Sequence, residues 1–386
     1  MELVYSKEGA GGQCALPEVS REVTDDDSAL FFKVVSVDIS EDAERIITQP
    51  QTVLPRQKNV LAIHWHPEFI PMDLIVRRVN AMFPNKDEEL IIPTQHNDLL
   101  FLGDYAGVEV DCYSAGFNQK VQLLLHFQKE RVQDAAVLRS MLEHTFKYRS
   151  SQLFAFIEAL AQPDEEILNK AAEETGAGED IVEFVRIVTA KIKILLEANY
   201  DQIPIFSIKN KVIKEFFNGL RPVYGNTWIN RCQAFLQEVK KLVKLNFPFK
   251  YFYRTSEIIE EVRSLGGGIV IPHPEQFWPI LLADYDVDGY EVWNPQSRRY
   301  TEFLIDVVNK TNHRASRQSR RLMIFMGDDT HMSEKIKPPE AQNQAKAARE
   351  IGYQPAWDDL AIRKKLILAK MDRGAVIEEY IARLTS

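Results

Sequence analysis

The sequence predicts an α/β fold, because short β-branched segments alternate with stretches of helical periodicity and metal-capable side chains follow several of the predicted strands. A chain of 386 residues can form one large domain with an insertion, or two or three ordinary domains. In α/β architectures, the carboxyl ends of the strands are where side chains converge on a site. We therefore expect a mainly parallel sheet or barrel with its functional site at that edge.

Composition excludes several classes of protein. The net charge of -9 argues against a surface that coats nucleic acid indiscriminately, so a nucleic-acid role would be confined to a local site. Three widely spaced cysteines without a CxxC pair argue against a disulfide framework. No apolar run approaches the roughly 20 residues that span a bilayer, and the first residues lack a signal-peptide pattern. We expect a cytoplasmic protein with no membrane partner.

The first part of the chain, residues 1–58, is predicted to be an N-terminal extension. It contains a β-branched and aromatic segment over 29–38 that predicts a strand, so the extension is expected to contain β-structure. From residue 59 to 128 the α/β alternation begins. It predicts a helix over 72–82 and strands over 60–64, 90–94, 107–110 and 121–127.

Strand signals disappear over 129–255, where apolar residues such as Ile181, Val185 and Val188 recur at helical spacing. This pattern predicts a helical insertion of four or five helices. The α/β alternation resumes over 256–333, with helices over 255–265 and 301–309 and strands over 269–271, 289–293 and 322–326. Residues 334–386 read as a tail that starts as a polar linker and ends in two helices.

His64 and His66 are two residues apart, so on a strand both imidazoles point to the same face and can bind one cation. A lone pair of this kind is as often a hydrogen-bonded core or surface feature. Further metal-capable residues, however, lie in or just after other predicted strands: His96, Glu109, His273, Asp329 and His331. Imidazoles with bridging carboxylates allow two ions to lie about 3.5 to 4 Å apart. The order of these residues therefore favours a hydrolase with a multinuclear metal site.

These motifs, in this order, resemble those of the polymerase and histidinol phosphatase (PHP) family of metal-dependent phosphoesterases. The resemblance covers about residues 59–128 and 256–333. It implies a distorted (β/α)7-type PHP barrel with an inserted helical region and an N-terminal extension. The matching positions are the HxH pair His64 and His66, the TDH-type His96, Glu109 in a Gly-Val-Glu strand, the AHP-type His273, Glu291 in a Gly-Tyr-Glu-Val segment, and the closing pair Asp329 and His331.

The resemblance also implies a ligand set. His64, His66, Glu109 and Asp329 would hold one ion, His96 and His331 would help to hold another, and His273 would hold a further ion with Glu109. Two or three divalent ions, zinc, manganese or iron, would activate water for attack on a phosphoester. The catalytic set would be His64, His66, Glu109, Asp329 and His331. The expected substrate is a phosphorylated small molecule or a nucleic-acid end.

The chain departs from the family pattern at Gln95, which replaces the aspartate of TDH, and at Gln122, where a metal-binding histidine is expected. Four other residues could bind metal, orient a ligand or have a plain structural role. They are His126, Glu291, Glu68 and Asp73.

Basic side chains without an intervening acid precede the last motif strand, and they include the candidate substrate-binding residues Arg317, Arg320 and Arg321. They could bind substrate phosphates, or they could form a solvated basic face on an acidic protein. Two other functions stay open. One is an amidohydrolase-type metal-dependent hydrolase, and the other is a degenerate PHP domain that acts as a binding module, which Gln95 and Gln122 would support.

Overall fold

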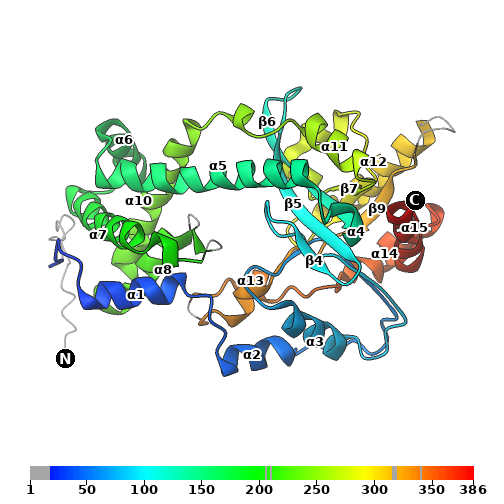
Figure 1. Ribbon diagram of the computed structural model, residues 1–386, viewed down its shortest axis with the longest axis horizontal. Helices are drawn as coiled ribbons and strands as arrows, with labels where there is room; N and C mark the ends of the chain where they lie inside the picture. Colours follow the sequence, from blue (N-terminus) through cyan, green and yellow to red (C-terminus); the bar gives the residue numbers. More distant parts are fainter. Residues whose placement is uncertain (1–17, 205–206, 209–210, 315–319, 340) are drawn as a thin grey trace, which may run out of the picture. The chain divides into compact units, whose positions relative to one another are not determined.

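The computed structural model describes residues 18–204, 207–208, 211–314, 320–339 and 341–386 (Figure 1). The chain divides into two compact units. The first, called here the helical unit, consists of residues 1–37 and 149–247, and the second, the mixed unit, consists of residues 38–148 and 248–386. Each unit buries its own hydrophobic core. The four-part division expected from the sequence stays a prediction.

The helical unit buries apolar residues that recur at helical spacing, among them Ile181, Val188 and Ile192. Its helices are α1 (Asp25–Val35), the second part of α5 (Ala136–Ala161), α6 (Glu165–Thr175), α7 (Glu179–Ala198), α8 (Lys211–Gly219), α9 (Arg221–Tyr224) and α10 (Asn226–Leu245), with a 3₁₀ turn at Tyr200–Gln202. The predicted helical character of 129–255 is therefore observed for the described residues of this range.

The strand predicted over 29–38 is wrong, because this segment forms α1. Thr24 caps the helix reciprocally with Asp27, and acidic residues fill the first turn, where they favour the positive end of the helix dipole. Phe31 and Val35, four residues apart, are both buried on one helical face. Capping and packing thus override the β-propensity of the aromatic and β-branched residues.

The mixed unit contains a six-stranded sheet in the order β4-β5-β6-β7-β8-β9 and two pairs of parallel strands, β1 with β3 and β2 with β10. In the large sheet, the pairs β4–β5, β5–β6 and β6–β7 are antiparallel, and the pairs β7–β8 and β8–β9 are parallel. The strands are β1 (Asn59–Ala62), β2 (Trp65–His66), β3 (Glu88–Ile91), β4 (Leu100–Leu102), β5 (Tyr105–Ser114), β6 (Gln119–Gln128), β7 (Gly268–Ile271), β8 (Gly289–Trp293), β9 (Met323–Met326) and β10 (Thr330–His331).

The fold is mixed α/β, but the strands of the described residues form three sheets and no closed barrel. The main departure from the expected (β/α)7 pattern is the long hairpin of β5 and β6. Only residues 115–118 separate these strands, and so short a connection can join antiparallel neighbours but cannot cross over to a parallel one. The parallel alternation is therefore confined to the last three strands of the sheet and to the two strand pairs.

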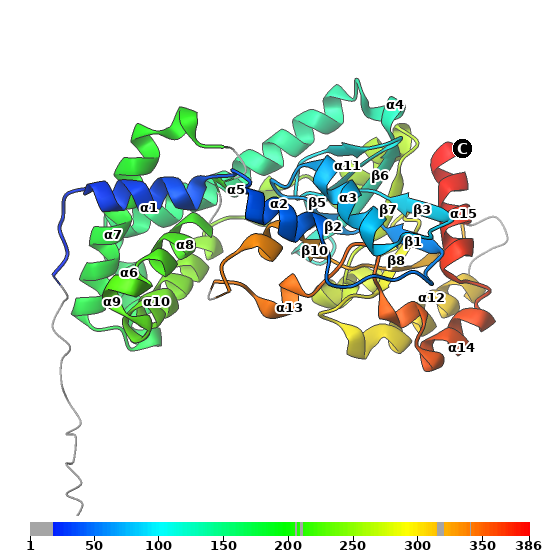
Figure 2. The same ribbon diagram turned by 90° about the horizontal axis from the view of Figure 1, so that it is seen from below.

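Helices cover the sheets of the mixed unit: α15 lies beside β1 and β3, and α2 lies beside α3 (Figure 2). The helices are α2 (Glu41–Thr48), α3 (Met72–Met82), α4 (Lys129–Val132), the first part of α5, α11 (Thr255–Ser264), α12 (Thr301–Arg314), α13 (Gln344–Ala347), α14 (Leu360–Leu368) and α15 (Arg373–Thr385). Short 3₁₀ segments occupy Phe249–Tyr251, Pro274–Leu282, Arg298–Tyr300, Met332–Ile336 and Pro355–Trp357. The helices predicted over 72–82 and 301–309 are present.

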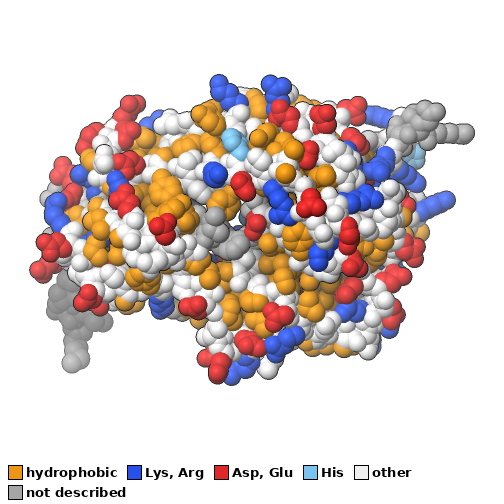
Figure 3. Space-filling model, viewed as in Figure 1, with side chains coloured by type: hydrophobic (Ala, Val, Ile, Leu, Met, Phe, Trp, Pro, Cys, Tyr) orange, Lys and Arg blue, Asp and Glu red, His pale blue; other side chains and the backbone are white. Residues whose placement is uncertain are grey.

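The sheet core is apolar, and fully buried residues such as Leu125, Val270 and Ile324 pack on it. Acidic and basic side chains are interspersed over the face shown in Figure 3. Within the described part of the chain, no helix has the length and apolar character needed to cross a membrane.

The helical unit contains a buried ion pair that yields a test of stability. Lys191 Nζ donates to Asp27 Oδ2 at 2.8 Å, and the two side chains are 5% and 12% exposed. Asp27→Asn would leave the lysine charge uncompensated, so we expect the free energy of unfolding to fall by about 3 kcal/mol. Hydrogen-exchange mass spectrometry of α7 would measure the loss.

A double variant and a pH series test the same pair. Asp27→Asn with Lys191→Met removes both charges and should recover much of the loss. Burial raises the pKa of Asp27, but the hydrogen bonds from Lys191 and Thr24 and the charge of Lys191 together outweigh it and lower the pKa below its usual value. The contribution of this pair is therefore present above about pH 4 and is lost as the pH falls below that. Equal protection of α7 in the wild type and the single variant would contradict this account.

Candidate metal centre

Seven metal-capable side chains meet in the mixed unit, and most of them come from segments that follow a strand. His64 follows β1 and His66 lies in β2, whereas His273 follows β7 and Asp329 follows β9. Glu109 lies in the middle of β5. The full set is His64, His66, His96, Glu109, His273, Asp329 and His331, which are the seven metal ligands predicted from the sequence.

Backbone pairing places these motifs side by side. β2 and β10 pair in parallel so that His331 lies opposite His66, and Asp329 donates its N–H to the His64 carbonyl at 2.8 Å. His96 forms a parallel bridge with Glu109. The two-residue spacing of each motif then turns its side chains to the same face, because side chains alternate along a strand. The main chain therefore determines which imidazoles share the pocket.

Glu109 lies among four imidazoles and is 1% exposed. Its Oε2 is 2.8 Å from His96 Nδ1, 3.4 Å from His66 Nε2 and 4.0 Å from His64 Nε2. Its Oε1 faces His273 Nε2 at 3.8 Å. The two oxygens of this carboxylate thus face different histidines, as a bridging ligand requires.

Asp329 is the second carboxylate that faces several imidazoles. Its Oδ1 is 3.5 Å from His331 Nε2, 3.6 Å from His66 Nε2 and 3.7 Å from His64 Nε2. Two ligand atoms, each about 2.1 Å from a tetrahedral ion, lie about 3.4 Å apart. These separations are long for hydrogen bonds but close to the edge of a coordination polyhedron.

Three overlapping groups of side chains could each hold an ion, namely His66 with His96 and His331, His64 with His66 and Asp329, and His64 with Glu109 and His273. His64 Nδ1 is 2.6 Å from Glu291 Oε2, so only Nε2 of His64 is left to bind metal. The two groups that contain His64 therefore compete for one nitrogen. A multinuclear site needs the carboxylates of Glu109 and Asp329 to be shared.

Unsatisfied polar atoms at the centre match a metal site. Among the described residues, no hydrogen-bond partner exists for His64 Nε2, for either ring nitrogen of His66, or for Oε1 of Glu109, and all of these atoms are buried. Leaving buried polar atoms unpaired costs about 1 to 3 kcal/mol each, more if they are charged. Divalent ions would satisfy these atoms together, so the residues present fit the ions that the sequence implied.

The charges of His66 and Glu109 are those of metal ligands. Burial and the neighbouring His331 lower the pKa of His66 to about 3, which leaves its imidazole neutral at neutral pH. Burial raises the pKa of Glu109, but the neighbouring His96, His66 and His64 together outweigh it and lower the pKa well below its usual range. Neutral imidazoles and ionised carboxylates are the forms that coordinate metal.

Glu291 orients His64. The carboxylate accepts the His64 Nδ1 hydrogen bond through Oε2 and a bond from Asn294 Nδ2 at 2.7 Å through Oε1. Burial lowers the pKa of His64, but the charge and hydrogen bond of Glu291, together with the charges of Asp329 and Glu109, outweigh it and raise the pKa to about 10 in the metal-free protein. Glu291 thus has the orienting role that the sequence left open beside direct coordination, because it fixes the tautomer that directs Nε2 into the pocket.

Two residues that sequence reasoning missed hold Asp329. Arg349 Nη1 donates to Asp329 Oδ2 at 2.7 Å and to its carbonyl at 2.9 Å, and Gln296 Nε2 lies 2.5 Å from the same Oδ2. This leaves Oδ1 to face the three histidines. Nothing in the local sequence of Arg349 indicated the role, because it lies in the segment read as a polar linker.

Glu68 lies at the edge of the pocket. Its Oε1 is 3.4 Å from His331 Nδ1, and its Oε2 accepts hydrogen bonds from the N–H and hydroxyl of Ser333. Gln95 accepts the Glu68 N–H, so this departure from the family pattern has a structural role beside the pocket. Glu68, His273 and Asp329 all adopt positive φ angles, which are costly for residues other than glycine and are concentrated at functional sites.

Two of the open candidates lie outside the set. His126 is fully buried, and both ring nitrogens are bonded, Nδ1 to the Tyr380 hydroxyl at 2.7 Å and Nε2 to the Ile63 carbonyl at 3.0 Å. It is therefore a satisfied core histidine. Asp73 is exposed in the first turn of α3, where it favours the helix dipole. Gln122 pairs with Asp111 in the hairpin and belongs to none of the three metal-capable groups.

Arg320 and Arg321, two of the three arginines predicted to bind substrate, lie away from the metal-capable side chains. Arg320 donates to Asp288, which directly precedes β8, and Arg321 precedes β9, whereas Asp329 follows β9. These arginines thus lie at the amino ends of strands whose carboxyl ends carry the site, about 13 Å away along a four-residue strand. Arg317 lies outside the described residues. A basic run in the sequence indicates charge but does not specify which end of a strand it reaches.

The sequence matches no family model and no curated protein. Among solved structures, the chain is similar to a "putative metal-dependent phosphoesterase" from Bifidobacterium adolescentis. The identity is 16%, the alignment covers 81% of this chain and 96% of the other, and the TM-score is 0.40. A likeness this distant carries no argument, so the site must be interpreted from its own side chains.

Glu291→Gln should weaken metal binding by about 10- to 100-fold, because an amide cannot hold His64 with the charge of a carboxylate. Titration of the metal-free protein with zinc against a chromophoric chelator measures the affinity. Glu197→Gln, at an exposed position of the helical unit, is the matched control and should leave affinity unchanged. Equal zinc affinity of Glu291→Gln and the wild type would remove Glu291 from the site.

Arg349→Met should leave Asp329 Oδ2 with the bond from Gln296 only and reduce zinc affinity by about tenfold, because the less restrained carboxylate could rotate away from the histidines. Arg349→Lys keeps the charge but cannot reproduce both bonds, so an intermediate loss is expected. Gln296→Ala tests the other contact. Unaltered affinity in all three variants, with the fold intact by circular dichroism, would show that Oδ1 needs no such support.

Proposed function

We propose that the protein is a metal-dependent hydrolase that cleaves phosphoesters. The observation that carries the proposal is the placement of two buried carboxylates, Glu109 and Asp329, each among three or more imidazoles at ligand-like separations. A single structural ion would need only four ligands. A set of seven suits a multinuclear centre, in which carboxylates bridge neighbouring ions.

The chain could hold two or three divalent ions, with zinc, manganese and iron as the candidates. His64, His66, Glu109 and Asp329 would hold the first, because the Nε2 atoms of both histidines face both carboxylates. His96 and His331 would hold the second. His273 faces the other oxygen of Glu109 and would hold a third ion. Mixed imidazole and carboxylate ligands suit these metals better than calcium or magnesium.

When bound, such ions lower the pKa of a coordinated water to about 7 and stabilise the oxygens of a phosphoryl group. The protein side chains control access and geometry. His96 is 40% exposed and His331 12% exposed, whereas His64 and His66 are 1% exposed. A substrate would therefore approach beside His96, with the other ligands shielded behind it.

The choice of a phosphoester over an amide or lactone is supported by the PHP-like order of the motifs. Arg320 and Arg321 no longer support it, because they lie at the other end of the sheet. The substrate class is a phosphorylated small molecule or a nucleic-acid end. The seven metal-capable residues are all present despite Gln95 and Gln122. A binding module without activity would not require this complete set.

Metal content and activity test the proposal together. We expect two or three metal ions per chain after expression in medium supplemented with zinc, manganese or iron, measured by elemental analysis. We also expect hydrolysis of phosphomonoesters, phosphodiesters or oligonucleotide ends that a chelator abolishes. His66→Ala should lower kcat/KM by about 10³-fold or more, because it removes a ligand from the centre of the set.

His313→Ala is the matched control, because this exposed histidine lies on α12 and, among the described residues, bonds the Asn309 carbonyl of its own helix. A parallel panel of amides and lactones separates the two hydrolase classes, and cleavage of these substrates alone would overturn the phosphoester assignment. Fewer than about one ion per chain would instead favour a binding module. Metal at full content with no turnover of any ester would also count against the proposed reaction.

A further inference from the structure

A second cleft lies in the mixed unit at the amino end of β1, away from the metal centre. Its volume is about 770 Å³, within the range of small-molecule sites. It is lined by the segment 53–59, by residues around Trp357, by the end of α14 and by the start of α15. His64 follows the opposite end of β1, about 16 Å along the chain from Asn59. The two sites are therefore distinct.

Arg373 supplies buried donors to this cleft. Its side chain is 12% exposed, and its Nη1 makes a long bond to the Asn59 carbonyl at 3.4 Å. Nε and Nη2 are buried and have no hydrogen-bond partner within the described ranges. The nearest carboxylate, exposed Asp358, stays 3.7 Å from Nη2. A guanidinium held with two unused N–H groups is suited to bind a planar pair of anionic oxygens.

Trp357 supplies another donor. It is 5% exposed, lines the same cleft, and its indole Nε1 is buried without a partner anywhere in the described part of the chain. The Arg373 guanidinium lies 5.9 Å from the Trp357 ring centroid. An indole nitrogen can only donate, as can a guanidinium. The unsatisfied groups here are thus all donors, and their common partner must be an acceptor.

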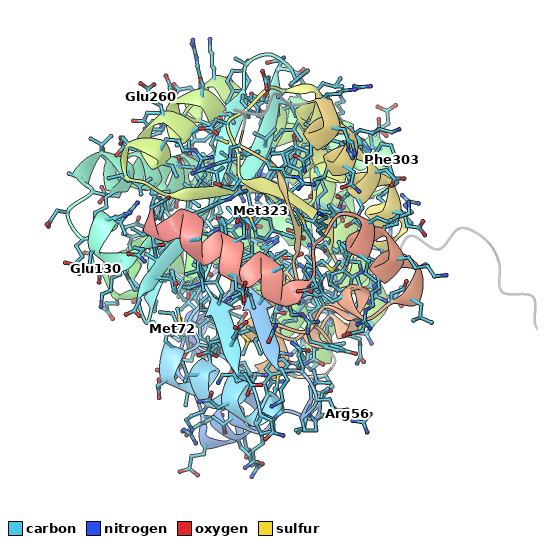
Figure 4. The ribbon with its side chains drawn as sticks, turned by 90° about the vertical axis from the view of Figure 1, so that its right-hand side faces the viewer. Arg56, Met72, Glu130, Glu260, Phe303 and Met323 are labelled. Atoms are coloured by element: carbon cyan, nitrogen blue, oxygen red, sulfur yellow. The ribbon has the colours of Figure 1, made fainter. Side chains whose placement is uncertain are left out.

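The surroundings favour an anion with an apolar part. The lining contains four basic side chains, Arg56, Lys58, Arg363 and Arg373, and two acidic ones, Asp358 and Asp372. Asp372 is already used as the N-cap of α15, whose first turn adds the positive end of a helix dipole. Leu366, Ile367 and Met371 form an apolar wall. Figure 4 shows α15 crossing the face turned to the viewer, with Arg56 below it.

We propose that this cleft binds a small organic anion, with phosphate or carboxylate oxygens on Arg373 and Trp357 and an apolar group against the α14 wall. The inference goes beyond the proposed hydrolase function and does not depend on it, since none of the seven metal-capable residues lines the cleft. Such a ligand would act as an effector or occupy a second site of the mixed unit.

Isothermal titration calorimetry of the full chain, dialysed against a chelator, tests the proposal. Phenylphosphonate and benzoate each carry an anionic head on an apolar ring and separate phosphate from carboxylate recognition, whereas benzyl alcohol lacks the charge. We expect at least one of the two anions to bind and benzyl alcohol not to bind. Arg373→Gln should weaken the binding by about tenfold or more, because it removes a charge-assisted pair of donors.

Trp357→Phe is a second variant, which removes the indole N–H and keeps an aromatic ring. We expect the affinity for the anion to fall by about threefold or more. Arg45→Gln, at an exposed position of α2, is the matched control and should bind as the wild type does. His331→Ala identifies binding at the metal centre, because it should leave the affinity for the cleft unchanged. Anion binding that is lost in His331→Ala and retained in Arg373→Gln, or no binding of either anion, would overturn the proposal.

Discussion

The mixed unit is organised around two carboxylates and five imidazoles that are largely withdrawn from water. Removing such groups from solvent is unfavourable unless each finds a partner, and many atoms here have none among the described residues. The groups that are bonded belong to a surrounding layer. Glu291 holds His64, and Arg349 holds Asp329. The inner layer is thus left ready for cations, and the outer layer keeps it from collapsing into internal hydrogen bonds.

The sheet provides the rigidity that this arrangement needs. β2 and β10 pair beside the centre, and a backbone bond joins Asp329 to His64. The positive φ angles of His273 and Asp329 show local strain that the packing around them must offset. The large sheet contributes Glu109 from the middle of a long hairpin and not from a strand end. The site therefore combines parallel strand ends with one antiparallel ribbon.

Local patterns were enough to predict much of this. The two-residue spacing of His64 and His66 predicted that both side chains point to the same side of the strand. The strand signals before His273 and Asp329 predicted that these two residues lie at the carboxyl ends of strands. Sequence patterns did not predict features that depend on a contact with a distant part of the chain. The helix α1 depends on its cap and on the burial of its apolar face, and Arg349 reaches Asp329 from 20 residues further along the chain. Closure of a barrel depends on how distant strands pair, which strand propensity does not encode.

The separation of these partners along the chain has a consequence for biosynthesis. His64 is made 227 residues before Glu291, which corresponds to roughly 10 to 45 seconds of translation. For most of that interval the early histidine pair has only His96 and Glu109 of its later neighbours, and it would hold a cation only loosely. Any ion captured on the ribosome would therefore exchange freely, and the identity of a bound metal would be decided by the pool that the finished protein meets.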